Sequence, residues 1–401
     1  MIEVLPIRNI EDARRAVRET GADDFCIDLM APKALGLCLR LSGVKMPAAN
    51  ILKQEMLACG GDAAVHRGVI DGSAKTSDVV ILGNVKQVLL ASRKLKDQPF
   101  GLKRIATELE AYCLSLMEPR PPVWRYRDRC FDFSPGPLVM GILNVTPDSF
   151  CDGGRFLEAE RAVARGLEME DQGADIIDIG GESTRPGAEP VPEEEELRRV
   201  LPVVEELSRK LKVPLSIDTY KSRIAERALQ AGASIVNDIS GLRFDPDMAA
   251  TAAKYSAGLI LMHIQGRPKD MQQNPSYRAV VAEVTASLAE GLEKAGACGL
   301  EPERVALDPG IGFGKDLEHN LKLLNNLGTL GTLGRPIVVG ASRKSFLAKL
   351  GAGEQPEQRL AGSLAAAVTA ALKGALVLRV HDVAETRRAL KVFRAIGDAG
   401  W

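Results

Sequence analysis

Residues 175–218 contain a strand–helix–strand pattern that decides the fold of the chain. They begin with the apolar run DIIDIG (175–180), end with PLSID (214–218), and enclose PEEEELRRVLPVVEELSRKL (192–211). In the middle stretch five apolar residues recur at three- and four-residue steps: Leu197, Val200, Leu201, Val204 and Leu207. This period predicts an amphipathic helix, and the glutamates at 193–196 suit the positive end of its dipole. A strand, a helix and a second strand together predict two parallel strands joined by a crossover helix.

Short apolar runs of this kind recur along the second part of the chain, with helical patterns between them. The runs are LVMGIL (138–143), DIIDIG (175–180), PLSID (214–218), ASIVND (233–238), LILMH (259–263), RVALD (304–308), PIVVG (336–340) and ALVLRV (375–380). Regular alternation of strand and helix is typical of a parallel sheet. A count of eight favours a closed (β/α)8 barrel over an open doubly wound sheet.

The boundary of this barrel is predicted from composition. Residues 119–137 read PRPPVWRYRDRCFDFSPGP and mix prolines, charges and aromatic residues without a period. We therefore expect a small α/β domain over residues 1–120, a linker over 121–136 and the barrel over 137–401.

The small domain also alternates strands and helices. MIEVLPI (1–7) is expected to be a strand and NIEDARRAVRET (9–20) a capped helix. A strand and a helix are expected within SDVVILGNVKQVLLASRKL (77–95), and a last helix from FGLKRIATELEAYCLSL (100–116). One group of polar and flexible residues stands out in it: Lys53, Glu55, Gly60, Gly61 and His66. We interpret them as helix caps and turns rather than as a site. A dimerising, substrate-handling or structural role for the domain stays open.

Charge and cysteine content exclude several classes of function. The chain has 52 basic and 53 acidic residues, so its formal net charge of -1 gives no reason to expect a nucleic acid or an anionic membrane as the main partner. Seven scattered cysteines without Cys-x-x-Cys spacing argue against a disulfide framework or a zinc site. Residues 1–20 carry charges where a signal peptide needs an apolar core, and no stretch approaches a membrane span. We expect a cytoplasmic protein with a small ligand.

Barrel enzymes place their active sites at the carboxyl ends of the strands, so the residues there are the candidates. Polar residues lie at or just after the end of every predicted strand. They are Asn144, Glu182, Arg185, Asp218, Asn237, Asp238, His263, Asp308, Arg343, Lys344, Arg379 and His381. Any one of them is explained by the ordinary polarity of strand ends. A complete ring of them indicates a binding site.

The side chains of this ring suggest a ligand with a heterocycle and an anionic group. The carboxylates of Asp218 and Asp308 and the amide of Asn237 suit a guanine-like or pterin-like edge with amino and ring N–H donors. Arg379 and His381 alternate on one strand and suit a phosphate group, while Lys344 suits either end of the ligand. Because no set of His and Cys ligands is present, a metal would be oxygen-bound Mg2+ that is held mainly by substrate phosphates.

The loops that follow the strands carry further candidates. DPGIGFGK (308–315) is rich in glycine, but it is not a phosphate-binding P-loop, because Pro309 occupies the first glycine position and Asp316 replaces the required Ser or Thr. LNVTPDSFCDGG (143–154) and GESTRPGAEP (181–190) are too polar and turn-rich to be packed. We expect both to overhang the mouth of the barrel.

Eight motifs in this order and spacing resemble one known family, dihydropteroate synthase, over roughly residues 137–398. They are MGILNVTPDSFCDGG, DIGGESTRPGA, SIDTYK, IVNDISG, LMHIQGRPKDMQ, DPGIGFGK, GASRKSF and RVHDV. The resemblance implies a TIM barrel and a transferase of folate biosynthesis. Its reaction joins 6-hydroxymethyl-7,8-dihydropterin diphosphate to 4-aminobenzoate and gives 7,8-dihydropteroate and pyrophosphate.

The resemblance also implies a role for individual residues. Asp218, Asn237, Asp308 and Lys344 match the family's pterin-binding positions. Asn144, Arg379 and His381 match the positions that hold the diphosphate and its Mg2+, with Asn144 as the metal ligand. The 4-aminobenzoate positions are matched by Phe150, Thr184, Arg185, Pro186, Phe313 and Ser345. Asp152 matches a loop carboxylate that assists at the reacting centre, so Asp152, Lys344, Arg379 and His381 form the implied catalytic set.

A subunit contact and three rival functions complete the expectations. The alanine-rich stretch RLAGSLAAAVTAALKGA (359–375) allows close approach of a second helix, which suits the homodimer that the family typically forms. A methyltetrahydrofolate to corrinoid methyltransferase would share an Asn and Asp pterin site, but it would not need the anion-binding Arg379 and His381. A non-catalytic pterin-binding protein is disfavoured because Lys344 and Asp218 are intact. A second activity in the first 120 residues stays open.

Overall fold

The chain folds into two compact units in the computed structural model. Unit 1 comprises residues 1–121 and unit 2 residues 122–400. The structure describes residues 2–118, 122–146, 155–184, 187–351 and 355–398. Phe150, Asp152, Arg185 and Pro186 lie outside these described residues.

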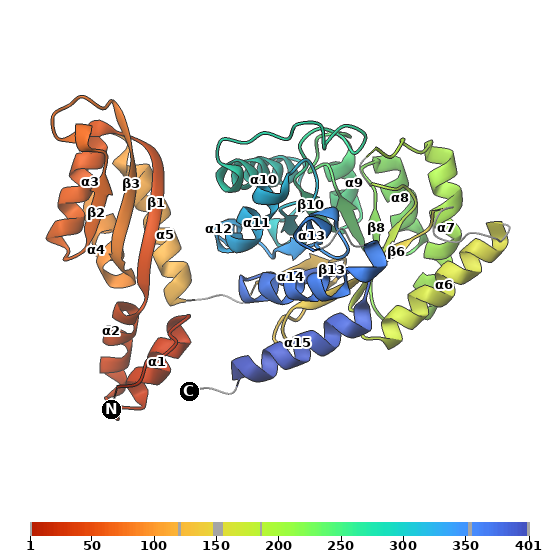
Figure 1. Ribbon diagram of the computed structural model, residues 1–401, viewed down its shortest axis with the longest axis horizontal. Coiled ribbons are helices and arrows are strands. Elements are labelled where there is room, and N and C mark those ends of the chain that lie inside the picture. The colour runs from red at the N-terminus through yellow and green to blue at the C-terminus, as the bar shows by residue number, and fades with distance from the viewer. Residues whose placement is uncertain (1, 119–121, 147–154, 185–186, 352–354, 399–401) are drawn as a thin grey trace. The chain divides into compact units, whose positions relative to one another are not determined.

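Unit 1 is a three-stranded antiparallel sheet with helices packed on one face (Figure 1). The strands are β1 (Gly36–Lys45), β2 (Asp62–Val65) and β3 (Thr76–Asn84), in the order β1-β3-β2. The helices are α1 (Ile10–Arg18), α2 (Asp24–Ala34), α3 (Met46–Ala58), α4 (Val85–Leu95) and α5 (Leu102–Met117). Residues of β3 alternate between buried and exposed over most of its length, since only one face of the sheet packs against helices. The core of the unit includes Leu52, Met56, Ile81 and Leu95, all fully buried.

The structure differs from the sequence analysis at the start of unit 1. The predicted strand MIEVLPI is wrong, because residues 2–7 form no strand and are mostly exposed. The first strand is β1 instead, preceded by α2, and neither element was predicted. In β1 the apolar Leu37, Leu39 and Leu41 alternate with more polar residues, which is the period of a half-buried strand.

Two of the five residues that the sequence analysis interpreted as caps and turns lie at helix ends, whereas Lys53 and Glu55 lie inside α3. Gly60 has a φ of +80° directly after α3, a conformation that favours glycine at the end of a helix. His66 precedes a short 3-10 helix (Arg67–Val69), and its Nδ1 atom accepts a hydrogen bond from the Gly68 N–H at 3.1 Å.

Unit 2 is a closed barrel of eight parallel strands, as predicted, surrounded by helices (Figure 1). The strands are β6 (Leu138–Asn144), β7 (Ile176–Gly180), β8 (Leu215–Asp218), β9 (Ile235–Asp238), β10 (Gly258–Met262), β11 (Val305–Asp308), β12 (Val338–Val339) and β13 (Val377–Val380). A parallel bridge between Leu307 and Ile337 joins β11 to β12 and completes the ring. These strands read as apolar runs because both of their faces are buried.

The helices of unit 2 follow the strands in alternation. They are α6 (Arg155–Asp171), α7 (Glu193–Lys210), α8 (Ser222–Ala231), α9 (Met248–Lys254), α10 (Val280–Ala297), α11 (Leu317–Asn325), α12 (Leu327–Gly331), α13 (Ser345–Leu350), α14 (Leu360–Leu372) and α15 (Val383–Asp398). Leu197, Val200, Val204 and Leu207 of α7 belong to the core between strands and helices, as their spacing predicted. None of the described helices is both long and apolar enough to cross a membrane.

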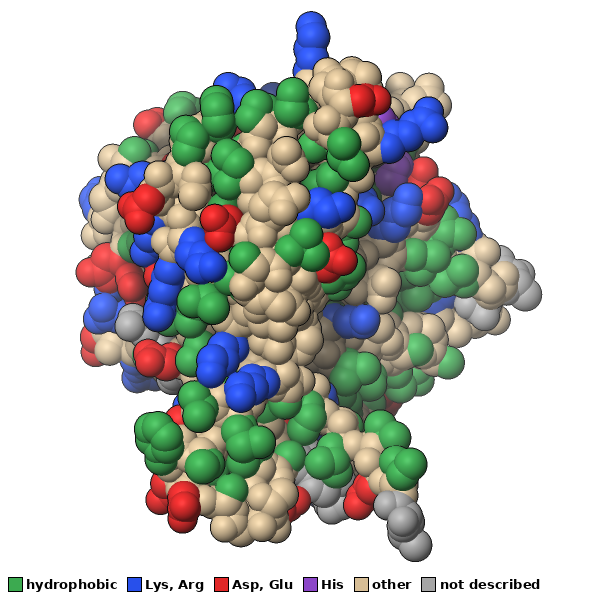
Figure 2. Space-filling model, turned by 90° about the vertical axis from the view of Figure 1, so that its left-hand side faces the viewer, with side chains coloured by type: hydrophobic (Ala, Val, Ile, Leu, Met, Phe, Trp, Pro, Cys, Tyr) green, Lys and Arg blue, Asp and Glu red, His purple; other side chains and the backbone are tan. Residues whose placement is uncertain are grey.

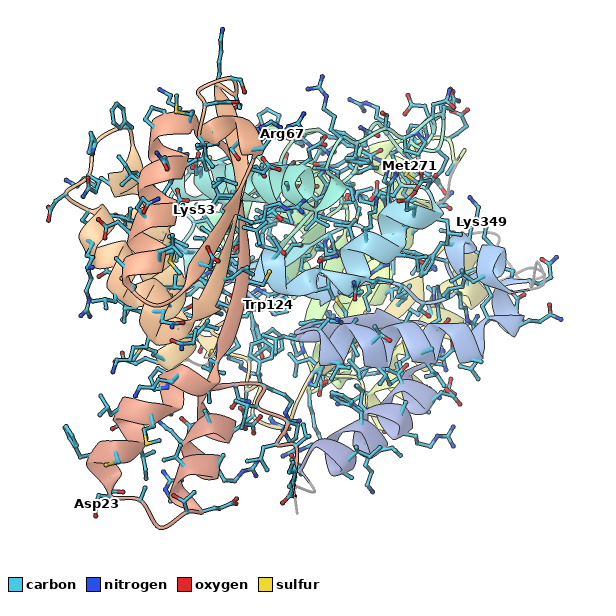
Figure 3. The ribbon with its side chains drawn as sticks, turned by 60° about the vertical axis from the view of Figure 1, so that its left-hand side comes forward. Asp23, Lys53, Arg67, Trp124, Met271 and Lys349 are labelled. Carbon is cyan, nitrogen blue, oxygen red and sulfur yellow. The ribbon has the colours of Figure 1, made fainter. Side chains whose placement is uncertain are left out.

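The stretch assigned to a linker contributes to the barrel from residue 122 on. It forms a hairpin of β4 (Arg125–Tyr126) and β5 (Arg129–Cys130). Trp124, labelled in Figure 3, is fully buried beside Met140, Ile176 and other residues from the amino-terminal halves of the barrel strands. Its indole N–H donates to the Arg304 carbonyl oxygen at 3.1 Å. The hairpin therefore covers the end of the barrel opposite to the predicted site.

Several large hydrophobic side chains of unit 1 are exposed. Figure 2 faces this unit and has hydrophobic side chains spread over much of the surface. Residues of α2 and of the segment before α1 contribute to the exposed set, which includes Ile2, Val4, Phe25, Leu29 and Met30.

Candidate active site

The pairing register brings several of the predicted site residues to one level of the barrel. Asn144 on β6 pairs with Gly180 on β7, Gly180 pairs with Asp218 on β8, and Asp218 pairs with Asn237 on β9. A Cβ atom placed on Gly180 would lie 3.7 Å from Asn144 Oδ1 and 3.6 Å from Asp218 Cβ. Glycine at this position therefore leaves open space between the two polar side chains.

A buried network of charges lies beside this level. Arg379 on β13 donates from Nε to Asp178 Oδ2 and from an Nη atom to Asp218 Oδ2, both at 2.6 Å. The amide nitrogen of Asn237 donates to the same oxygen of Asp178 at 3.0 Å. Although burial disfavours charge on Arg379, the two carboxylates raise the pKa of its guanidinium above the ordinary value.

Two carboxylate oxygens of the network have no hydrogen-bond partner among the described residues. They are Asp178 Oδ1 and Asp218 Oδ1, and both are buried. Buried acceptors without partners are costly, so their presence indicates a ligand that brings N–H or O–H donors. Asp308, at the end of β11, is also buried, and one of its oxygens accepts from the Gly310 N–H at 2.6 Å.

Burial also shifts the proton affinity of the groups around this space. It raises the pKa of Asp218 to about 7 and raises the pKa of Asp308 as well. Burial lowers the pKa of Lys344 to about 7, against the opposing influence of Asp308 and Asp218. Acidic and basic side chains with strongly shifted pKa values, gathered at the same end of the strands, are typical of a functional site.

The glycine-rich loop after β11 brings an aromatic ring to the same space. Phe313 is 7% exposed and packs with Ile239, Met262 and Met271. Lys344 Nζ lies 4.4 Å from the centroid of the Phe313 ring and donates to the carbonyl oxygen of Ile311. Gly312 has a φ of +82°, and a Cβ atom on it would lie 3.0 Å from the Lys344 side chain. The loop can approach Lys344 this closely because position 312 has no side chain.

His381, Ser345 and Thr184 are the other predicted residues that the structure describes. The backbone N–H of His381 donates to Ser342 Oγ at 3.2 Å, and its ring Nδ1 lies 3.1 Å from the same oxygen, so Ser342 orients the imidazole. Ser345 is exposed at the first residue of α13, and Thr184 is partly buried in the loop between β7 and α7. The other four predicted residues lie outside the described part of the chain.

Four polar residues of the predicted ring contact other protein groups instead of open space. Asp238 accepts from the backbone N–H groups of Ser240 and Leu242 at 2.8 and 2.7 Å. His263 Nδ1 lies 3.0 Å from Lys315 Nζ, and burial lowers the pKa of this histidine to about 2. Arg343 forms an ion pair with Asp382, and Glu182 forms one with Lys221. These residues shape the rim rather than line the ligand space.

Asp178 is a functional candidate that the sequence reasoning missed. Its side chain is fully buried, and it contacts two predicted site residues, Arg379 and Asn237. The signal in the sequence was an acidic residue in the middle of the apolar run IIDIG. Inside a parallel strand, such a residue needs a partner or a ligand.

The described residues do not form a complete metal site by themselves. No group of three or more His, Cys, Asp or Glu side chains in the described ranges could hold an ion. The amide oxygen of Asn144 at the open end of β6 is a hard ligand of the kind that Mg2+ accepts. This donor set fits a cation that takes most of its ligands from a bound substrate.

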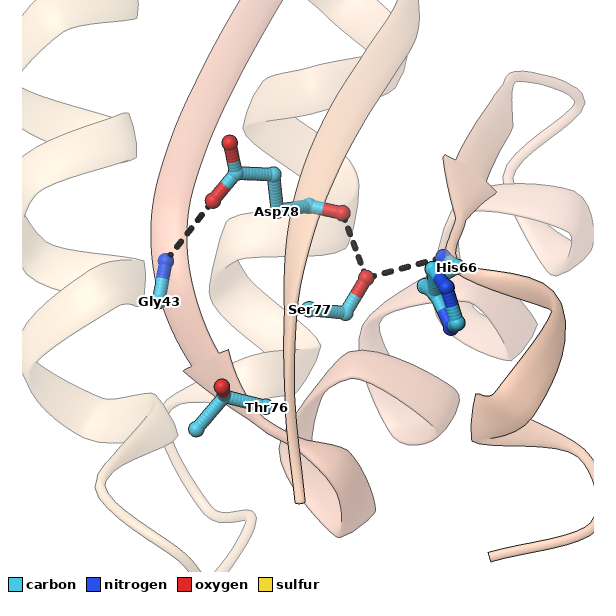
Figure 4. Close-up of a pocket in the computed structure, with 5 residues that line it drawn as sticks. All are labelled: Gly43, His66, Thr76, Ser77 and Asp78. Atoms are coloured by element: carbon cyan, nitrogen blue, oxygen red, sulfur yellow. Dashed lines mark hydrogen bonds between the residues drawn. The ribbon is translucent and has the colours of Figure 1, made fainter. Parts of the chain in front are cut away.

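Unit 1 has a separate pocket of about 500 Å3, lined by Gly43, His66, Thr76, Ser77 and Asp78 (Figure 4). Ser77 Oγ accepts from the His66 backbone N–H at 2.9 Å and donates to the Asp78 carbonyl oxygen at 2.5 Å. A carboxylate oxygen of Asp78 accepts from the Gly43 N–H at 3.0 Å. These bonds connect the strands of the sheet, so the polar groups of the pocket have a structural use.

Comparison with known proteins assigns the chain to a class. The pattern of the family described as pterin binding enzyme matches residues 140–381. Dihydropteroate synthase of Synechocystis sp. is 45% identical over 276 residues, which are 69% of this chain and 96% of that protein. The structure of dihydropteroate synthase from Xanthomonas albilineans with 4-aminobenzoic acid is 46% identical with a TM-score of 0.66, and it covers 70% of this chain and 100% of that one. The same enzyme in complex with 7,8-dihydropteroate has a TM-score of 0.63 at 44% identity, over 69% of this chain and 100% of that chain.

The barrel and its strand-end site thus define a pterin-binding enzyme. The chain belongs to the dihydropteroate synthase family, and it is a transferase of folate biosynthesis.

One relative extends over unit 1 as well. A probable bifunctional folylpolyglutamate synthase/dihydropteroate synthase of Haloferax volcanii is 38% identical over 400 residues, which are 98% of this chain and 47% of that protein. The Synechocystis protein matches only 69% of the chain. A counterpart of unit 1 therefore occurs next to a dihydropteroate synthase barrel in a larger protein.

Proposed function

We propose that unit 2 binds 6-hydroxymethyl-7,8-dihydropterin diphosphate at the carboxyl ends of its strands and transfers the pterin to 4-aminobenzoate. One observation carries the assignment of the pterin site: buried carboxylates converge on one space, and two of their oxygens lack partners among the described residues. The amino and ring N–H groups of a pterin are the donors that such oxygens need. Asp218, Asn237 and Asp308 would bind this edge of the ring, and Lys344 would bind its acceptor atoms.

We assign the diphosphate to the side of the site formed by Arg379 and His381. Arg379 keeps its charge at any physiological pH, and Ser342 orients the ring of His381. Mg2+ bound to the diphosphate supplies further positive charge to the leaving group, and Asn144 would be its protein ligand. Phe313, Thr184 and Ser345 would form the 4-aminobenzoate site, together with Phe150, Arg185 and Pro186. Asp152 would assist at the reacting centre.

The chemistry requires one bond to break and one to form. The bond between the exocyclic methylene carbon of the pterin and a diphosphate oxygen breaks, and the electron pair leaves with pyrophosphate. The resulting cation is stabilised by delocalisation into the electron-rich ring, so we propose that the bond breaks before the new one forms. The aniline nitrogen of 4-aminobenzoate then attacks the methylene carbon and releases a proton to water. Because this nitrogen is already nucleophilic, the protein contributes mainly position and charge.

Pyrophosphate release by the purified chain tests this function. With dihydropterin diphosphate and Mg2+, we expect release that depends on 4-aminobenzoate and yields 7,8-dihydropteroate. Binding of the pterin without turnover would contradict the proposal and favour a binding protein or a methyltransferase. Exchange of labelled pyrophosphate into the substrate in the presence of an unreactive aminobenzoate analogue would support bond breaking first. Strictly concerted displacement would contradict the dissociative order.

We also propose a homodimer formed through α14. Its buried side carries Ala366, Ala367 and Ala370, whereas Ala365 and Leu372 are exposed on the other side. Small residues let a second helix approach closely. Light scattering should give twice the chain mass of 43.1 kDa, and Ala365→Arg should reduce it to that of one chain. A dimer that tolerates Ala365→Arg would place the contact elsewhere.

A further inference from the structure

We infer that Lys221 is a positioning residue for 4-aminobenzoate, because its ammonium group joins the two ends of the loop that carries Thr184. The loop runs from Gly181 after β7 to Pro192 before α7. This inference rests on the proposed aminobenzoate site. Lys221 itself lies after β8, at the start of α8, and does not belong to the loop.

All three donor positions of the Lys221 ammonium group are used. Nζ donates to Glu182 Oε2, to Glu196 Oε2 and to the carbonyl oxygen of Val191, each at 2.6 Å. An ammonium group has three N–H bonds, so this arrangement satisfies it completely. Its partners come from the first residues of the loop, the last residues of the loop and the first turn of α7.

Glu182 completes the link between the two ends of the loop. One of its oxygens accepts from the Val191 N–H at 3.0 Å, and the other accepts from the Tyr220 hydroxyl at 2.8 Å. Both backbone polar groups of Val191 are therefore bound to the Lys221–Glu182 pair. Because only one residue separates Glu182 from Thr184, fixing Glu182 restricts the positions that Thr184 can take.

The low exposure of this cluster makes its geometry hard to change. The side chains of Lys221, Glu182 and Glu196 are 13%, 6% and 1% exposed. A buried charge that loses its partner is far more costly than one at the surface, so each member constrains the others. Exposed ion pairs elsewhere on the barrel, such as Lys254 with Glu226, do not constrain their members in this way, because water can solvate either charge when the pair is broken.

The described part of the loop is attached on its other flank as well. The Gly187 N–H donates to the Pro268 carbonyl oxygen at 3.1 Å, and Glu189 forms an ion pair with Lys269 at 2.8 Å. Both partners belong to the segment after β10. These bonds fix the described residues on either side of 185–186, and displacement of a substrate-positioning group by about 1 Å is enough to cost about 100-fold in rate.

Lys221→Met tests the inference, because methionine keeps the apolar stem and removes the ammonium group. In the full chain with saturating dihydropterin diphosphate, we expect the KM for 4-aminobenzoate to rise by at least about tenfold. The Kd for dihydropterin diphosphate, measured by calorimetry without 4-aminobenzoate, should stay within about twofold, because the hydrogen bonds of Lys221 go to Glu182, Val191 and Glu196 and to none of the proposed pterin-binding residues. Lys254→Met, which breaks an exposed ion pair, is the matched control and should change neither constant.

Two milder variants keep the test decisive if Lys221→Met does not fold. Tyr220→Phe removes one hydrogen bond to Glu182, and Glu196→Gln removes one charge while it retains an acceptor for Lys221. Each should raise the KM for 4-aminobenzoate in the same direction by about two- to fivefold. Folded variants with an unchanged KM, or with an equal loss of pterin affinity, would overturn the inference. Failure of the unmodified chain to release pyrophosphate would instead overturn the proposed function, and this inference with it.

Discussion

Asp178 Oδ2 accepts two hydrogen bonds at once, from Arg379 Nε at 2.6 Å and from Asn237 Nδ2 at 3.0 Å. Because the amide nitrogen of Asn237 is bound to Asp178, its oxygen is the atom left to meet a ligand. We predict that Asp178→Asn loses one of the two carboxylate partners of Arg379 and the fixed amide orientation of Asn237 together. Loss of hydrogen bonds to charged groups should lower kcat/KM for dihydropterin diphosphate by about 10- to 100-fold, measured in steady state.

A neighbouring carboxylate provides the control for Asp178. Asp175 lies directly before β7, accepts from the Val139 N–H at 2.7 Å and pairs with Arg387. Asp175→Asn should lower the free energy of unfolding without a specific effect on kcat/KM. If both variants reduced kcat/KM equally, the role of Asp178 would be structural support rather than orientation of the site.

The barrel could be predicted from the sequence because parallel strands are buried on both faces. Runs such as LILMH and RVALD are therefore continuous, and the polar residue that ends each run marks the open end of the barrel. Asp218, Asn237 and Asp308 were found by this rule. This rule did not identify Asp178, because Asp178 lies inside β7, two residues before the end of the strand.

The partners of the predicted residues could not be read from the sequence. Glu182 and His263 follow strand ends as Asp218 does, yet the structure pairs them with Lys221 and Lys315. Which side chain faces the ligand depends on contacts between loops that are distant in the sequence. The structural role of Trp124 could not be predicted for the same reason, since its hydrogen-bond partner Arg304 is 180 residues away in the sequence.

Protonation of Asp218 should make the stability of the ligand-free protein depend on pH. Its pKa is raised to about 7 by burial, whereas an unfolded aspartate titrates near 3.8. Between these values the folded chain holds a proton that the unfolded chain releases, so its contribution to stability is present at pH 4 and is lost as pH rises through 7. The loss can reach about 1.4 kcal/mol per pH unit.

Urea unfolding of the wild type and of Asp218→Asn at pH 4 to 7 measures this contribution. The asparagine has no proton to lose, so the difference in unfolding free energy between the two proteins should change with pH in favour of the variant as pH rises. A difference that stays constant from pH 4 to 7 would show that Asp218 is already ionised at the lower pH.

Two glycines of unit 2 should respond to alanine in opposite directions. Gly310 has a φ of +67°, and a Cβ atom there would lie 1.9 Å from the His263 carbonyl oxygen. Gly310→Ala should therefore lower the free energy of unfolding by at least about 2 kcal/mol and displace the loop that carries Phe313. Gly296 lies in α10, and no heavy atom would lie within 4 Å of a Cβ atom added there. Gly296→Ala should therefore raise the free energy of unfolding by about 0.5–1 kcal/mol. Equal effects of the two variants in urea unfolding would contradict this account.

Trp124 should be essential to the stability of the barrel, although it lies outside the strands. Its ring is fully buried at the amino-terminal end of the barrel, and Trp124→Ala should cost about 3–5 kcal/mol through the cavity that it leaves. Val123, which is 38% exposed, is the matched control, and Val123→Ala should change stability by less than about 0.5 kcal/mol. Urea unfolding followed by circular dichroism measures both variants.

The same contact predicts where unit 2 can be separated from unit 1. A chain that starts at residue 122 keeps Trp124 and the Arg127 side chain, which donates to the carbonyl oxygens of Leu229 and Ala233 at 2.9 and 2.6 Å. A chain that starts at residue 137 loses the whole hairpin and exposes the apolar residues that Trp124 covers. We expect the first to unfold cooperatively and release pyrophosphate, and the second to aggregate or unfold at lower urea concentration. Equal stability of the two would mean that the hairpin contributes little, because the barrel interior is then closed without it.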